Sequence, residues 1–243
     1  MIGLVTGANR GLGLELVKEG LKRGHTIAAA SRSTEEESVP ELYALKREYG
    51  EKLEILSLDV VKEEQAGEAA KKISESWGCV DFLFNNAGVL FEKNQVEGDC
   101  IADIDIEKFR ETLDVNITGM AIVLKHFIRL LYQSQNACIM NITSEAGCLS
   151  PQGYNYLAYS VSKYGANMYT QKIRNYLWEE KPEKGIRIYM IHPGRMDTMM
   201  GKENAQIDPK ESAEGLYEIL EGKKKIPFME IPFINYKGEP MLH

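Results

Sequence analysis

The sequence has few cysteines, and it has no long apolar run. Its four cysteines, Cys79, Cys100, Cys138 and Cys148, show no C-x-x-C spacing. The first residues run directly into a strand-like pattern, so no secretory signal is expected, and the cysteines are predicted to be free thiols in a reducing cytoplasm. No apolar stretch reaches the ~18 residues that a bilayer-spanning helix needs, so no membrane contact is expected.

Basic residues are scarce relative to acidic ones. The chain has 29 Lys and Arg against 36 Asp and Glu, a net charge of -7, and its one basic cluster is the short run 223–225. A general nucleic-acid binder carries a basic surface, so no nucleic-acid partner is expected. Internal repeats and long linkers are absent as well, and 243 residues with 44% hydrophobic side chains can bury one large core. We therefore expect one α/β domain over residues 1–243.

Strand-like and helix-like patterns alternate along almost the whole chain. Apolar strand-like runs occupy 1–6, 25–30, 53–59, 80–85, 137–143, 186–192 and 227–234. Helical spacing of apolar residues occupies 11–23, 41–49, 64–77, 106–134, 156–180 and 209–220, with a kink expected near Gly119. Strands separated by helices predict a Rossmann-type, doubly wound parallel sheet of about seven strands with helices on both faces. The prolines of the last run predict an edge strand.

A glycine-rich turn joins the first predicted strand to the first predicted helix. It reads Thr6-Gly-Ala-Asn-Arg-Gly-Leu-Gly13, at the place where a doubly wound sheet binds a dinucleotide. Glycines let the backbone approach a pyrophosphate, and the helix N-terminus offers N–H groups and a positive dipole end. The residues predicted to bind the cofactor here are Gly7, Asn9, Arg10, Gly11, Leu12 and Gly13. A tight turn without a ligand is the weaker alternative.

The end of the second strand predicts which dinucleotide is bound. NAD sites usually place Asp or Glu there to hold the ribose 2′-hydroxyl, whereas this chain has Ser31 followed by Arg32. No carboxylate would repel a 2′-phosphate, Arg32 can pair with that phosphate bidentately, and Arg10 can flank it. We expect NADP, with NAD less favoured.

Tyr159 and Lys163 are four residues apart in a predicted helix, within the run Tyr156-Leu-Ala-Tyr-Ser-Val-Ser-Lys163. Positions i and i+4 share one face of a helix, so a phenol and an ammonium are presented to the same pocket. A free phenol has a pKa of about 10, and a cation about 4 Å away could lower it by as much as ~3 units. We therefore expect Tyr159 to act as a general acid or base near neutral pH.

These features belong to a longer series of motifs in a fixed order. The further members are Asp59-Val60, Asn85-Asn86-Ala87-Gly88, Val115-Asn116, Asn141-Ile-Thr-Ser144, and Pro193-Gly194 with Thr198. With these motifs the chain resembles the classical short-chain dehydrogenase/reductase family over essentially its whole length. Its tail, 236–240, is similar to that of the subgroup of C-factor-like and small carbonyl reductases.

The resemblance implies an oxidoreductase that reduces a ketone or aldehyde to an alcohol, or the reverse, by hydride transfer with NADP. Tyr159 would exchange a proton with the substrate oxygen, and Ser144 would donate a hydrogen bond to it. Lys163 would lower the pKa of Tyr159 and hold the nicotinamide ribose, and Asn116 would position Lys163 through a water. The other implied cofactor contacts are Asp59, Val60, Asn86, Ala87, Gly88, Tyr159, Lys163, Pro193, Gly194, Met196 and Thr198. Asn86 could instead stabilise a turn, and no metal ligand is expected.

Two other functions remain open from the sequence. Tyr156 lies seven residues before Lys163, and a Tyr-x6-Lys spacing resembles the related enoyl-thioester reductases, which reduce a carbon–carbon double bond. A non-catalytic, NADP-binding redox sensor is an alternative of another class, although such a protein would not need the Tyr159/Lys163 pair.

The predicted substrate walls are 89–103, 195–208 and the loop after Ser144. Their apolar members are Leu90, Phe91, Leu149, Tyr154, Tyr156, Met196, Met199 and Met200, which favours a smallish, apolar carbonyl or alcohol substrate. The resemblance also implies a homodimer or homotetramer, and a monomer remains an alternative.

Overall fold

The computed structural model describes residues 1–92, 98–149, 153–197 and 205–242. Its centre is a seven-stranded sheet in the order β3-β2-β1-β4-β5-β6-β7, in which every neighbouring pair is parallel. The strands are β1 (Ile2–Thr6), β2 (Thr26–Ser31), β3 (Leu53–Ser57), β4 (Phe82–Asn85), β5 (Cys138–Ile142), β6 (Arg187–His192) and β7 (Phe233–Asn235). The predicted doubly wound Rossmann-type sheet of about seven strands is confirmed.

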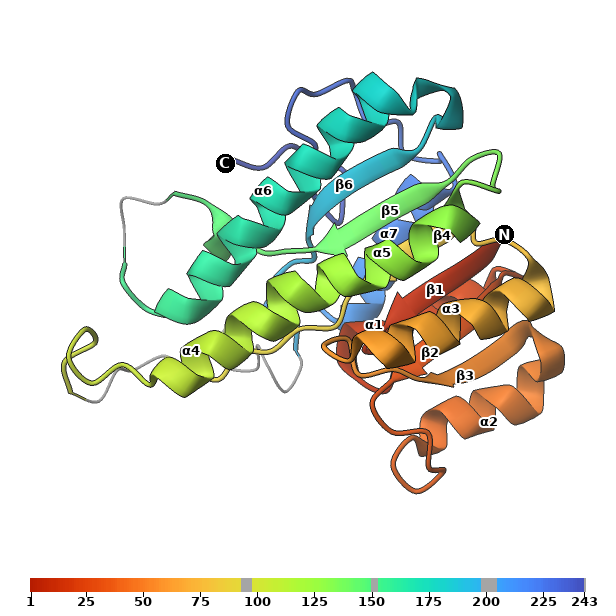
Figure 1. The fold of residues 1–243 in the computed structure, drawn as a ribbon, viewed down its shortest axis with the longest axis horizontal. Helices are drawn as coiled ribbons and strands as arrows, with labels where there is room; N and C mark the ends of the chain where they lie inside the picture. The colour runs from red at the N-terminus through yellow and green to blue at the C-terminus, as the bar shows by residue number, and fades with distance from the viewer. Residues whose placement is uncertain (93–97, 150–152, 198–204, 243) are drawn as a thin grey trace.

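Helices cover both faces of the sheet (Figure 1). They are α1 (Gly11–Lys22), α2 (Pro40–Tyr49), α3 (Glu63–Trp77), α4 (Ile106–Leu113), α5 (Gly119–Leu131), α6 (Leu157–Glu180) and α7 (Pro209–Leu220). One core cluster joins the sheet to α1, α2 and α7, and the other joins it to α3, α5 and α6. Val5 and Leu4 of β1 belong to opposite clusters, because successive side chains of a strand point to opposite faces.

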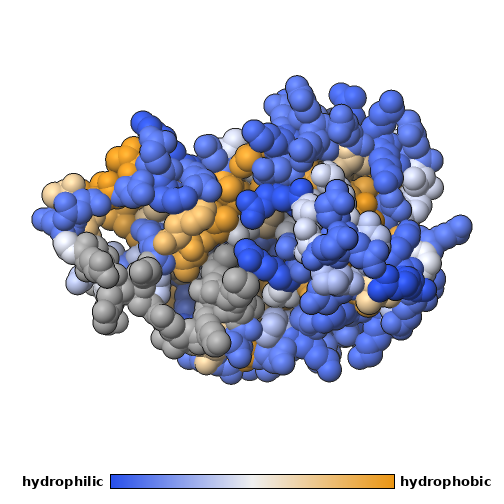
Figure 2. Space-filling view, turned by 90° about the horizontal axis from the view of Figure 1, so that it is seen from below, coloured by the Kyte–Doolittle hydropathy of each residue, from blue (hydrophilic) through white to orange (hydrophobic). Residues whose placement is uncertain are grey.

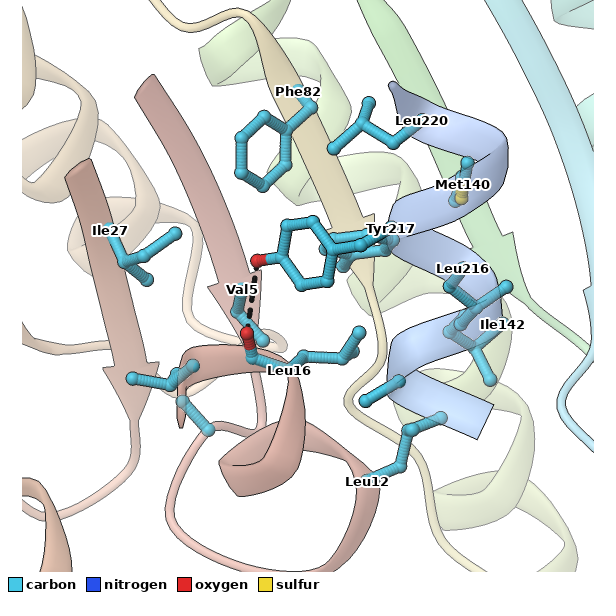
Figure 3. Close-up of a cluster of buried hydrophobic side chains, with 14 of the residues drawn as sticks. Val5, Leu12, Leu16, Ile27, Phe82, Met140, Ile142, Leu216, Tyr217 and Leu220 are labelled. Atoms are coloured by element: carbon cyan, nitrogen blue, oxygen red, sulfur yellow. Dashed lines mark hydrogen bonds between the residues drawn. The ribbon is translucent and has the colours of Figure 1, made fainter. Parts of the chain in front are cut away.

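The first cluster is centred on Tyr217 of α7. Its ring packs edge-on against Phe82 and Phe84 of β4, as the close-up of this cluster shows for Phe82 and the neighbouring aliphatic side chains (Figure 3). The buried hydroxyl of Tyr217 donates to the carbonyl of Leu16 at 2.9 Å, so the polar atom is satisfied inside an apolar core. This contact joins α7 to α1, whose amino end carries the glycine-rich turn.

The structure corrects the predicted bounds of several elements, most by one or two residues. The helix expected over 106–134 is two helices, α4 and α5, separated by a π-helical turn over Asp114–Thr118, just before the expected kink at Gly119. The strand expected over 227–234 is only Phe233–Asn235, although it is an edge strand as predicted. Helix α6 begins at Leu157, one residue later than predicted, because Tyr156 is left-handed (φ 60°, ψ 47°).

Parallel strands place all their carboxyl ends at one edge of the sheet. Thr6, Ser31, Asn85, Ile142 and His192 end their strands there, so the loops that follow them meet at that edge. Among the described residues, none of the helices combines the length and the apolar character that a membrane crossing needs.

Candidate active site

A large cleft opens at the carboxyl edge of the sheet, with a volume of about 1880 Å³. A single ligand pocket is usually about 300–1,000 Å³, so this cleft has room for two ligands side by side. Its walls include both the glycine-rich turn and the side chains of Ser144, Tyr159 and Lys163. The predicted cofactor-binding turn and the predicted catalytic residues therefore lie in one cleft.

The glycine-rich turn is closely packed against its own backbone. Gly7 and Gly11 have φ values of +64° and +54°, in the left-handed region that glycine adopts without strain. A Cβ on Gly13 would lie 2.0 Å from the carbonyl oxygen of Gly7. Gly13 therefore lets α1 pack closely against the turn, whose glycines line the cleft at the N-terminus of this helix.

Asn86 fastens the end of β4 to this turn. Its side-chain amide donates to the carbonyl of Thr6 at 2.9 Å and to that of Gly7 at 3.3 Å. The hydroxyl of Thr6 accepts from the backbone N–H groups of Asn86 and Ala87, both at 3.0 Å. The turn-stabilising alternative for Asn86 is thus supported by direct contacts, while Asn86 also lines the cleft.

The end of β2 carries a buried hydroxyl and an exposed guanidinium. Ser31 is 3% exposed, and its hydroxyl donates to the carbonyl of Ser33. Arg32 and Arg10 are both exposed and both line the cleft. Two cationic side chains thus line the cleft, and β2 ends without a carboxylate.

Tyr159 and Ser144 meet on the floor of the cleft. Tyr159 lies in the first turn of α6, Ser144 follows β5, and their side chains are hydrogen-bonded. Ser144 Oγ also accepts from the backbone N–H of Ala146 at 3.1 Å, so its own proton is left to donate to an oxygen. The two hydroxyl groups can therefore both hydrogen-bond to the same substrate atom.

Lys163 lies one turn further along α6 and is 4% exposed. Its Nζ donates to the carbonyl of Ile142 at 2.9 Å and is 5.5 Å from the centre of the Tyr159 ring. Burial lowers the pKa of Lys163 to about 8, because removal of the ammonium from water disfavours its charged form.

The expectation that Lys163 lowers the pKa of Tyr159 is wrong in this structure. Burial raises the pKa of Tyr159 to about 12, the hydrogen bond with Ser144 offsets part of that rise, and the charge of Glu145 adds to it. Lys163 points its Nζ at Ile142 rather than at the phenol oxygen. Tyr159 therefore holds its proton firmly at neutral pH.

Asn116 lies beneath the cleft wall, in the π-helical turn between α4 and α5. It is 1% exposed, accepts from the backbone N–H of Val89 at 2.8 Å, and donates to the carbonyl of Val89 and the hydroxyl of Ser162. A Cβ on Gly88 would lie 3.2 Å from Asn116 Oδ1 and 3.5 Å from Lys163 Nζ. Asn116 and Lys163 thus border the same small space.

A charged cluster stands next to Ser144. Glu145 pairs with Arg195 at 2.5 Å, and the ring of His192 accepts from the backbone N–H of Glu145 at 3.2 Å. His192, at the end of β6, thus binds the backbone of the segment that follows β5. The contact between Glu145 and Arg195 also joins the segment after β5 to the segment after β6.

All but one of the predicted cofactor contacts line the cleft. They are Gly7, Asn9, Arg10, Gly11, Leu12, Gly13, Ser31, Arg32, Asp59, Val60, Asn86, Ala87, Gly88, Tyr159, Lys163, Pro193, Gly194 and Met196. The exception, Thr198, lies outside the described residues, as do Met199 and Met200. The roles of all these residues stay predictions.

The sequence reasoning missed Glu92 and Glu145. Both line the cleft, and Glu92 accepts hydrogen bonds from the first turn of α6. One signal for Glu92 was present, since no Ser, Thr, Asp or Asn directly precedes Leu157 to cap its helix.

Several side chains in the cleft wall are apolar and exposed. Phe91, Leu149, Tyr154 and Leu242 line it and are exposed. The space-filling view shows apolar surface gathered on the half of the molecule nearer α4, while the other half is mostly polar (Figure 2). This supports the expectation of apolar substrate walls.

Comparison with known proteins gives the family. Residues 2–208 match the family described as short chain dehydrogenase. The chain is 30% identical over 198 residues to the NADPH-dependent pterin aldehyde reductase of Arabidopsis thaliana, a match that covers 80% of this chain and 74% of that protein. The NADPH-bound carbonyl reductase from chicken fatty liver superposes with a TM-score of 0.84 at 26% identity, over 99% of this chain and 98% of that one. The carbonyl reductase Sniffer of D. melanogaster, 24% identical, has the same fold with a TM-score of 0.86 over 99% of this chain and 98% of that one.

The chain therefore belongs to the short-chain dehydrogenase/reductase family, and it is an oxidoreductase. The resemblance predicted from the motifs is confirmed by the family match.

Proposed function

We propose that this protein reduces the carbonyl group of a small, apolar aldehyde or ketone with NADPH, or oxidises the corresponding alcohol. The observation that carries the proposal is the cleft in which the glycine-rich turn faces the hydrogen-bonded Ser144 and Tyr159 beside the buried Lys163. The NADPH-dependent aldehyde reductase and the NADPH-bound carbonyl reductase among the relatives support the same chemistry.

The residues of the cleft fit the cofactor. The glycine-rich turn lines the cleft at the N-terminus of α1, where free backbone N–H groups would hold the pyrophosphate. Arg32 and Arg10 would hold the 2′-phosphate that distinguishes NADP from NAD. When bound, the cofactor supplies the hydride, and the protein orients it and manages the proton.

Tyr159 would give its proton to the substrate oxygen as negative charge develops there. A phenol with a pKa of about 12 stays protonated at neutral pH, yet it is a stronger acid than the alcohol that it would help to form. Ser144 would donate a second hydrogen bond to the same oxygen and stabilise the developing charge. This pair of donors favours the reducing direction near pH 7.

Lys163 would act on the cofactor side of Tyr159. Its ammonium has three N–H donors, and the carbonyl of Ile142 accepts from one of them. We assign to Lys163 the nicotinamide ribose hydroxyls, and to Asn116 the placement of Lys163 through a water in the space that they share beside Gly88.

The enoyl-thioester alternative requires Tyr156 on the catalytic helix. Tyr156 precedes that helix and is left-handed, whereas Tyr159 is hydrogen-bonded to Ser144. The geometry therefore favours carbonyl chemistry. The sensor alternative predicts cofactor binding without turnover.

The test is a panel of aldehydes and ketones offered with NADPH and with NADH, followed by the loss of absorbance of the reduced nicotinamide. Turnover with NADPH on apolar carbonyls is expected. Binding of NADPH with no turnover on the whole panel would contradict the proposal and favour the sensor.

A further inference from the structure

We propose that Glu92 is a positioning residue for Tyr159, because its carboxylate fixes the first turn of the helix that carries the tyrosine. The inference rests on the proposed role of Tyr159 as the proton donor. Glu92 lies in the segment that follows β4, 67 residues before Tyr159, and both residues line the cleft.

The carboxylate of Glu92 binds two consecutive backbone amides of α6. Oε1 accepts from the N–H of Ala158 at 2.8 Å, and Oε2 accepts from the N–H of Tyr159 at 2.9 Å. The first N–H groups of a helix have no partner within the helix, and the intrahelical pattern of α6 starts only with Ser160, whose N–H donates to Tyr156. Glu92 thus satisfies the second and third amides, which a capping residue normally serves.

The residue directly before α6 does not cap this helix. Tyr156 is left-handed and makes no side-chain cap, and the first turn of α6 has no acidic residue. Helices α4 and α7 are capped by the residues directly before them, Asp105 and Asp208, whereas α1, α2 and α3 have no side-chain cap. The helix that carries Tyr159 and Lys163 thus receives its cap from a distant segment.

The contact restrains Tyr159 in two ways. It holds the backbone of Tyr159 itself, so it limits where the phenol can lie relative to Ser144. It also joins α6 to the wall that carries Phe91, the neighbour of Glu92, which lines the substrate side of the cleft. A negative charge at the amino end of α6 is further favoured by the helix dipole.

The experiment compares Glu92→Gln and Glu92→Ala with a matched control, Asp105→Ala. Gln keeps one acceptor oxygen and Ala keeps none, while Asp105→Ala removes the cap of α4, a helix without a predicted catalytic residue. A displacement of about 1 Å at a catalytic group can cost about 10²-fold in rate. We expect kcat to fall by about 10-fold in Glu92→Gln and by about 10²-fold in Glu92→Ala, with the Kd for NADPH unchanged.

The control should lose thermal stability but keep the wild-type kcat. If Glu92→Ala does not fold, Glu92→Gln alone decides the question. Wild-type kcat in the Glu92 variants, or a loss of kcat in Asp105→Ala as large as theirs, would overturn the proposal.

Amide hydrogen exchange provides a second measurement that needs no turnover. The amides of Ala158 and Tyr159 should be protected in the wild-type protein and should exchange at least about 10-fold faster in Glu92→Ala, since their acceptor is gone. Unprotected amides in the wild type would refute the Glu92 contact. Protected amides in a wild-type protein that reduces no carbonyl would refute the proposed function and, with it, the role of Glu92 in positioning a catalytic group.

Discussion

The cofactor end and the substrate side of the cleft are held in different ways. At the cofactor end, the glycine-rich turn bonds to the end of the adjacent β4 through Asn86 and Thr6. On the substrate side, carboxylates bridge separate segments, as Glu92 does to α6 and Glu145 does to Arg195. The first kind of contact follows from neighbouring parallel strands, and the second depends on how distant loops fold over the edge.

The largest effect is expected for Tyr159→Phe. Removal of the proton donor should lower kcat by about 10²-fold or more, while the Kd for NADPH, measured by fluorescence, stays near its wild-type value. This result would show that Tyr159 is needed for proton transfer on the substrate side of the cleft and is not needed for cofactor binding. Tyr156→Phe is the matched control, and a larger loss in that variant would favour the enoyl-thioester alternative.

The next effect tests the cofactor end through Arg32→Asp. A charge-assisted hydrogen bond is worth about 1.5–3 kcal/mol, so the preference for NADPH over NADH in kcat/KM should fall by about 10- to 100-fold. Lys52→Glu, an equally drastic charge change at another exposed position, should leave the preference unaltered. An unchanged preference for NADPH over NADH in Arg32→Asp would show that Arg32 does not bind the 2′-phosphate.

Gly13→Ala tests whether cofactor binding depends on the close packing of α1 against the glycine-rich turn. The added Cβ would lie 2.0 Å from the Gly7 carbonyl oxygen and 2.7 Å from Asn86 Nδ2, so the turn would have to shift and affinity for NADPH should fall by at least about 10-fold, or about 1.4 kcal/mol. In Gly67→Ala, on α3, the nearest atoms lie 3.5 Å away, and helix propensity should raise the free energy of unfolding by about 0.5–1 kcal/mol. Titration calorimetry measures the affinity and thermal unfolding measures the stability, and equal affinity in Gly13→Ala would show that binding does not depend on this packing.

The smallest effect is expected for Lys163→Met, which removes a buried ammonium that lowers the stability of the folded protein. Its pKa is lowered from 10.5 to about 8 in the folded protein, so between those values the unfolded chain binds more protons and stability rises with pH. Lys163→Met removes this ionisation and should raise Tm by a few degrees at pH 7, with the difference from wild type shrinking as pH rises from about 8 towards 10.5. A Tm below that of wild type at every pH would show that the hydrogen bond to Ile142 outweighs the buried charge.

The fold and much of the site could be predicted because they depend on local patterns. Alternating periodicities define the parallel sheet, and parallel strands bring the glycine-rich turn, Ser144 and the Tyr159/Lys163 pair to one edge. The helical spacing of Tyr159 and Lys163 also holds in the structure. The direction of the Tyr159 pKa shift could not be predicted, because the spacing does not reveal that Lys163 donates to Ile142 and that both groups are buried.

The sequence by itself determined the alternation of strands and helices, the dinucleotide-binding turn, and the residue types available for proton transfer, since each follows from spacing within a short segment. Only the tertiary structure decided that Tyr156 precedes α6, that Glu92 caps this helix, and that Glu145 pairs with Arg195 beside Ser144. The two carboxylate contacts join residues about 50 to 67 positions apart, and a carboxylate in a loop carries no local sign of the partner that it will meet.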